Sequence, residues 1–183
     1  MINQESSGTG SNFAANRDVN INIGPKHFSI LSEIINSLGG DFDSELSDDK
    51  AEKPFNIQEK LDYNNINRFK VFIDEYHIYV GKLTSVYREY EKQGSNKVHN
   101  LLTNIRRHYL VIKNKFTTDI ETEDEMSVIR SHADDIIEEI EKSLMNEVQH
   151  SSNIKEPVET IRVSLLIVII DALIKCKILE EPK

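Results

Sequence analysis

The sequence predicts an all-α protein, an antiparallel bundle of about four long helices preceded by a short N-terminal β-strand arm and a short helix. Two observations support this fold class. The 183 residues include only seven glycines and four prolines, so few positions force a helix to stop. Over most of the chain, apolar residues recur at alternating intervals of three and four, the spacing that places them on one face of an α-helix.

The N-terminal part begins with a tail and one strand. Residues 4–12 are rich in Ser, Gly and Asn and are expected to be mobile. Residues 18–23 alternate polar and apolar side chains and end at a Gly-Pro pair, which predicts a short strand. Its apolar side chains are Val19, Ile21 and Ile23. A lone strand is unstable in water, so it needs a second copy of the chain, a partner protein or an unrecognised segment to pair with.

A short helix and an acidic linker complete this part. Residues 27–38 have helical apolar spacing and are followed by two glycines, a typical helix end. Residues 41–54 are acidic with scattered apolar positions, as in a linker. The predicted division is therefore an N-terminal part at residues 1–54 and a helical interaction domain at residues 55–183.

The first two long helices are predicted to form an antiparallel hairpin. The first carries the stripe Ile66, Phe69, Ile73, Tyr76, Val80, Leu83, Tyr87 and Tyr90. The second carries the stripe Val98, Leu101, Ile105, Tyr109, Ile112 and Phe116. A turn at residues 94–96 separates them, and Asn96 is the expected N-cap of the second helix.

The third and fourth helices follow from similar signals. A capping box of Thr122 and Glu125 starts the third, with the stripe Met126, Ile129, Ala133, Ile136, Ile140 and Leu144. Pro157 lies in the first turn of the fourth, which is predicted to reach residue 179. Residues 163–170 are apolar nearly all round, which indicates burial on several sides. A buried strand is the alternative there, but the helical spacing on both flanks favours a helix.

Composition excludes several classes of protein. A net charge of −9 gives nucleic-acid backbones no general attraction to the chain. The single cysteine cannot form an intramolecular disulfide, which fits a reducing cytoplasm. The N-terminus lacks the apolar stretch of a signal peptide, and the longest apolar run is too short to span a membrane. A cytoplasmic protein without contact to the membrane is expected.

One basic cluster, Arg106, Arg107, Lys113 and Lys115, is the candidate for nucleic-acid contact. No acidic residue occurs at residues 93–118, whereas the next helix is strongly acidic. Charge matching between these two helices is the favoured explanation of both clusters. Contact with nucleic acid through the second helix remains the alternative.

No catalytic, cofactor-binding or metal-binding residue is predicted. Asp74 and His77 are one helical turn apart but too few to make a stable metal site. P-loop, dinucleotide-binding and nucleophile-elbow motifs are missing from the sequence. The chain is therefore expected not to be an enzyme.

Asp171, Lys175 and Cys176 are assigned structural roles. Asp171 interrupts the apolar run, and a buried carboxylate is unstable unless it is paired. Lys175, one turn further on, is the local partner, and hydrogen bonds to a helix end or to tyrosines are the alternative. Cys176 lies on the apolar stripe and is expected to behave as a small buried apolar side chain.

From about residue 63 to residue 183, the chain resembles a C-terminal domain family of the bacterial ABC-three-component systems. The resemblance rests on YNNI at residues 63–66, NIRRHY at residues 104–109 and IIDALIKCKILEEP at residues 169–182. The last stretch is the most specific, because helix packing alone does not require it. The leader with GTGSN at residues 8–12 and DVNINI at residues 18–23 is also similar to leaders ahead of such modules.

The resemblance implies an adaptor in a prokaryotic conflict system, active against viruses or plasmids. Such helical domains tie an effector or accessory chain to an ABC ATPase related to SMC and RecN proteins. Nothing upstream in this sequence is large enough to be an effector, so the expectation is either an effector on another chain or an accessory role for this chain. Because the fourth helix is more apolar than a four-helix bundle requires, Ile170 and Ile174 are predicted to face a partner protein.

Overall fold

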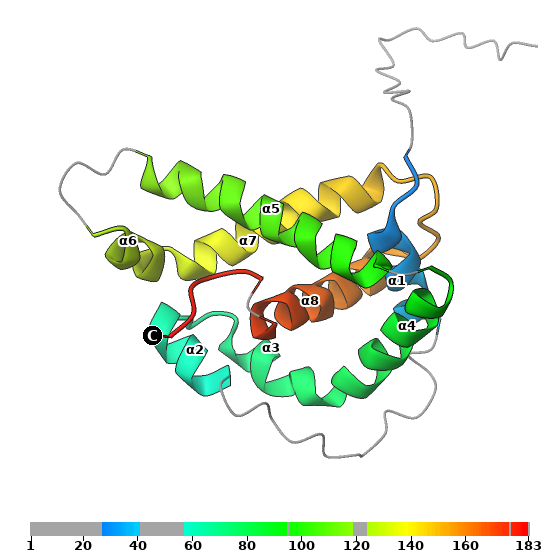
Figure 1. The fold of residues 1–183 in the computed structure, drawn as a ribbon, viewed down its shortest axis with the longest axis horizontal. Coiled ribbons are helices and arrows are strands. Elements are labelled where there is room, and N and C mark those ends of the chain that lie inside the picture. The colour runs from blue at the N-terminus through cyan, green and yellow to red at the C-terminus, as the bar shows by residue number, and fades with distance from the viewer. Residues whose placement is uncertain (1–26, 41–56, 95, 119–123, 176, 183) are drawn as a thin grey trace, which may run out of the picture.

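The computed structural model describes residues 27–40, 57–94, 96–118, 124–175 and 177–182, and no β-strand occurs among them (Figure 1). The all-α class is therefore confirmed for this part of the chain. The predicted tail, strand, linker, Thr122 cap and buried Cys176 all lie outside the described residues. The partner-binding roles assigned to Val19, Ile21 and Ile23 accordingly stay predictions.

The described residues form eight α-helices and one 3-10 helix, η1. They are α1 (Ile30–Gly39), α2 (Ile57–Asn64), α3 (Lys70–Glu75), η1 (Tyr76–Ile78), α4 (Val80–Lys92), α5 (Lys97–Thr117), α6 (Glu125–Ser131), α7 (Ala133–Gln149) and α8 (Val158–Ile174). Only α5, α7 and α8 among them have 17 or more residues. The predicted bundle of four long helices is not confirmed, because shorter helices surround three long ones.

Helix α8 lies at the centre of the fold (Figure 1). Helices α5 and α7 run antiparallel to each other and both pack on α8, while α3, η1 and α4 curve around it from the other side. Its buried residues point in all directions around the helix and include Leu165, Ile167, Val168, Ile169 and Ile170. The preference for a helix over a buried strand is confirmed here, as is burial on several sides.

Helix α1 belongs to this same core, although the sequence assigned it to the N-terminal part. Its apolar residues Leu31, Ile34, Ile35 and Leu38 are fully buried, and the helix packs on α4, α5 and α8. The Ser29 hydroxyl caps its start by accepting a hydrogen bond from the Ser32 N–H. At its end, a Cβ on Gly39 would lie 2.6 Å from Thr160 of α8, so glycine permits the close approach. The core thus includes residues on both sides of the boundary predicted at residue 55.

The predicted first long helix is divided, which corrects the expectation of one straight helix. Residues 70–75 are α-helical, η1 follows, and α4 begins at Val80. Tyr76 and Tyr87 both donate hydrogen bonds to the carboxylate of Asp171, at 2.7 and 3.0 Å. In a straight α-helix these tyrosines would be about 16 Å apart along the axis. The bend at η1 brings both hydroxyls to the same carboxylate.

Two helix starts also differ from the sequence-based expectations. Asn96 does not cap α5 with its side chain; it has a φ of 74°. Instead, the Glu91 carboxylate accepts hydrogen bonds from the N–H groups of Asn96 and Val98, at 3.1 and 2.9 Å. The predicted third helix is interrupted at His132, which separates α6 from α7.

The segment after α8 folds back over the helices, so the fourth helix ends at Ile174 and does not reach residue 179. Ile178 and Leu179 are buried in the core. The Asn64 side chain holds this segment by donating to the Glu180 carbonyl at 2.8 Å and accepting from the Glu180 N–H at 3.0 Å. The C-terminal segment is thus joined to the end of α2.

Candidate functional site

An apolar groove lies between the α3–η1 segment and α8, and it is the candidate partner-binding site. The groove encloses about 170 Å³. It is lined by Phe72, Glu75, Tyr76, Tyr79, Val163, Leu166, Ile167 and Ile170. Glu75 is the one charged residue in this lining, so the groove is suited to apolar side chains of another molecule.

The rim of the groove exposes apolar side chains, whereas its floor is buried. Phe72 and Val163 are 46% and 45% exposed, on opposite sides of the groove. Ile170 is only 4% exposed, so the prediction that it faces outward is wrong. Ile174 is half-buried and packs against the core. Ile170 and Ile174 are covered because α1 to α4 pack on faces of α8 that a four-helix bundle would have left open.

Beneath this floor, Asp171 is held by three side chains from three segments. Its carboxylate accepts hydrogen bonds from Tyr76 and Tyr87 and forms an ion pair with Lys175 at 2.8 Å. The prediction that Asp171 is buried and paired is confirmed, with both the lysine and the tyrosine partners present. Since Tyr76 also lines the groove, the Asp171 cluster fixes the position of the groove wall.

The two tyrosines act as hydrogen-bond donors at any physiological pH. Burial, followed by the charge of Asp171, raises the pKa of both Tyr76 and Tyr87 far above the ordinary 10.0. The Lys175 ammonium also lies 4.5 Å from the centre of the Tyr87 ring. The cluster is therefore a hydrogen-bonded structural unit that joins η1, α4 and the end of α8.

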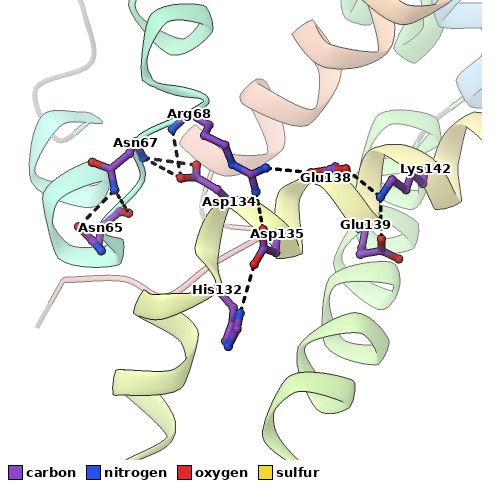
Figure 2. Close-up of polar contacts among 9 residues, drawn as sticks. All are labelled: Asn65, Asn67, Arg68, His132, Asp134, Asp135, Glu138, Glu139 and Lys142. Carbon is purple, nitrogen blue, oxygen red and sulfur yellow. Dashed lines mark hydrogen bonds and ion pairs between the residues drawn. The ribbon is translucent and has the colours of Figure 1, made fainter.

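A second polar cluster fixes the start of α3 against α7 (Figure 2). The Asp134 carboxylate accepts hydrogen bonds from the backbone N–H groups of Asn67 and Arg68, both at 3.1 Å. The Arg68 guanidinium binds Asp135 at 2.5 Å and Glu138 at 3.0 Å. These pairs are half-exposed and individually weak, but together they set where α3 begins and hence where Phe72 lies.

The predicted charge match between α5 and the following acidic helices is found only in part. Lys113 of α5 binds Glu125 of α6 at 2.8 Å and also Glu180 at 2.9 Å. His108 lies 3.4 Å from Glu147 of α7 and, with Asn104 and Ser29, lowers the pKa of that carboxyl. The acidic start of α7 pairs instead with Arg68, a residue that the sequence analysis did not consider. Arg106, Arg107 and Lys115 are exposed.

Asp74 and His77, the two residues considered as metal ligands, lie in the α3–η1 segment. His77 hydrogen-bonds the Asp74 carbonyl at 2.7 Å, and the described residues contain no cluster of three or more potential metal ligands. In the same part of the chain, no helix combines the length and the apolar character that a bilayer crossing needs.

Glu180 gives a pH-dependent prediction. Burial tends to raise its pKa, but hydrogen bonds from Lys113 and Tyr109 outweigh burial and hold the pKa below the ordinary 4.5. A lowered pKa contributes stability that is present above pH 4.5 and is lost as the pH falls through the folded-state value. Glu180→Gln should therefore have a lower melting temperature than wild type at pH 7. The corresponding loss in the free energy of unfolding is less than about 1 kcal/mol, since the carboxylate is partly solvated.

Thermal melts of both proteins between about pH 7 and pH 3 check this prediction. The two melting temperatures are expected to converge at the acidic end. A constant difference across the whole range would contradict the role given to the Glu180 charge. Glu181→Gln is the matched control, since Glu181 is exposed and adjacent.

The groove residues Phe72, Tyr79 and Val163 were missed by sequence reasoning. Val71 and Phe72 are adjacent apolar residues, and Phe72 lies off the stripe of Phe69, Ile73 and Tyr76. The sequence signal that could have identified Phe72 is an aromatic residue outside a stripe that already forms the buried face of its helix.

Comparison with known families places almost the whole described chain in one domain. Residues 29–180 match CTD10, described as C-terminal domain 10 of the ABC-three component (ABC-3C) systems. No curated protein and no solved structure matches the chain. The matched range includes α1 and all the helices that follow it, in agreement with a single core.

Proposed function

Because the chain belongs to the C-terminal domain 10 family of ABC-three-component systems, we propose that it is a non-catalytic adaptor or accessory subunit of such a system. In this proposal it acts in the bacterial cytoplasm against viruses or plasmids. It links an effector to an SMC/RecN-like ABC ATPase through protein–protein contacts. Family membership supplies the system, and the adaptor role is our inference.

The observation that carries the adaptor role is the α3–α8 groove. Phe72 and Val163 expose apolar surface on its two sides and do not belong to the buried core. Exposed apolar residues around a recess are typical of protein-binding sites. The groove wall is held in place from below by Asp171 and from the side by Arg68, so it is preorganised for a partner.

The groove is tested by Val163→Asp and Phe72→Asp in the full chain, co-expressed with the ATPase and effector of its own system. Each variant is expected to weaken co-purification by about tenfold or more, because a charge in an apolar contact loses about 1.4 kcal/mol or more. The matched control is Val158→Asp on the same helix, where Val158 is 40% exposed but does not line the groove.

The variants should keep wild-type circular dichroism, and their melting temperatures should change little. Equal loss of co-purification in Val158→Asp, or wild-type assembly in both groove variants, would contradict the groove as the contact site. Metal-dependent turnover of a nucleic acid or peptide by the purified chain would contradict the non-catalytic role.

The alternative function is nucleic-acid contact through α5. Arg106, Arg107 and Lys115 are exposed, whereas Lys113 is bound to Glu125 and Glu180. DNA binding that weakens steeply with salt would support this alternative. A net charge of −9 opposes it.

A further inference from the structure

A second groove lies on the opposite flank of α8, between the two antiparallel helices α5 and α7. Its volume is about 540 Å³, and it is open to solvent. It is lined by Asn104, Arg107, His108, Val111, Ile112 and Lys115 of α5 and by Glu139, Lys142 and Ser143 of α7. None of these residues lines the α3–α8 groove, so this is a separate surface.

The charges along this groove are unbalanced toward positive. Lys142 is bound by Glu138 and Glu139, at 2.8 and 3.0 Å. Within the described part of the chain, no carboxylate forms an ion pair with Arg107 or Lys115. These two cations lie two helical turns apart on α5, about 12 Å along its axis. An acidic protein therefore carries a cationic stripe at this place.

Apolar surface lies between the two cations. Val111 is 63% exposed and stands midway between Arg107 and Lys115, with the buried Ile112 beside it. A phosphate backbone gains little from an exposed valine at the middle of its contact. An amphipathic peptide, by contrast, can bury an apolar side chain on Val111 and place acidic side chains on the flanking cations.

We propose that the α5–α7 groove binds an acidic amphipathic helix of a partner protein. Two unpaired cations are few for nucleic acid, whose binding depends on many phosphate contacts and a positive surface. A second copy of this chain is disfavoured as the occupant, because α7, the acidic amphipathic helix that it could offer, already buries its apolar face in its own core. A groove between two antiparallel helices that lie side by side accepts a third helix in the usual packing geometry.

The occupant needs about three turns to cover the stripe. An apolar residue packs on Val111, and carboxylates four residues on either side reach Arg107 and Lys115. His108 is engaged by Ser143 at 2.9 Å and thus remains part of the groove wall.

The test uses the full chain labelled with ¹⁵N and a synthetic acidic amphipathic peptide of about 14 residues, close to four turns, with leucines at helical spacing and glutamates elsewhere. Amide shifts should change at Arg107, Val111 and Ser143. The double variant Arg107→Glu/Lys115→Glu should bind the peptide about tenfold or more weakly, measured by fluorescence anisotropy. The matched control is Arg88→Glu/Lys155→Glu, which changes net charge equally at exposed positions outside the groove.

Two further probes separate the sources of binding. A peptide with lysines in place of the glutamates should leave the groove amides unshifted, and a DNA duplex of about 20 base pairs should bind more weakly than the acidic peptide. Tighter binding of the duplex, equal loss in the control variant, or no shift at the groove residues would overturn the proposal. None of these readouts involves Phe72 or Val163, so they are independent of the adaptor contact at the first groove.

Discussion

Replacing Asp171 with alanine is expected to lower the free energy of unfolding by about 3–5 kcal/mol. The substitution removes the acceptor of two buried tyrosine hydroxyls, and an unpaired buried donor costs about 1–3 kcal/mol. It also leaves Lys175 without its ion-pair partner at 2.8 Å. Urea or guanidinium unfolding followed by circular dichroism measures this loss.

Two variants separate the buried hydrogen bonds from the ion pair. Asp171→Asn keeps the shape and one acceptor and should cost less than the alanine substitution. Lys175→Ala should cost less than Asp171→Ala, because the lysine side chain is 42% exposed and both tyrosines still donate to the Asp171 carboxylate. If Asp171→Ala unfolds no more easily than Lys175→Ala, the tyrosine hydrogen bonds do not stabilise the bend at η1.

Truncating Ile34 to alanine should also destabilise the protein strongly, by about 2–4 kcal/mol. Ile34 of α1 is completely buried against helices from both halves of the chain. The expected loss follows from the cavity left between α1, α4 and α8. Chemical unfolding of the full chain measures it, together with the unfolding slope, which should stay unchanged if the chain unfolds as one unit.

Phe28→Ala is the matched control, because Phe28 lies just before α1 and is 65% exposed. Its effect should stay within about 0.5 kcal/mol. If Ile34→Ala behaved like Phe28→Ala, α1 would be an independent appendage, as the boundary at residue 55 assumed.

Helical periodicity correctly predicted those helices whose buried faces in the fold are the ones that the local apolar spacing indicates. The stripe from Val98 to Phe116 became α5, and the apolar run at residues 163–170 became the buried centre of α8. Asp171 was predicted to be paired because burial of an isolated carboxylate is costly wherever it occurs. These inferences depend on local spacing or on a general energetic rule.

The bend at η1 could not be predicted in this way. Tyr76, Val80 and Tyr87 satisfy the spacing of one straight helix, and the partner that bends the chain is Asp171, far along the sequence. The prediction that Ile170 faces outward is wrong for the same reason. Which face of an all-round apolar helix is left open depends on which other helices cover it.

The central position of α8 has a consequence for synthesis of the protein. Among the described helices, α1 is synthesised first and α8 last, and the two touch in the folded chain. At about 5–20 residues per second, α1 waits on the order of ten seconds for its partner. During that interval its apolar face can contact α4 and α5 but lacks its native contact with α8. Native packing of α1 is therefore complete only after α8 has been synthesised.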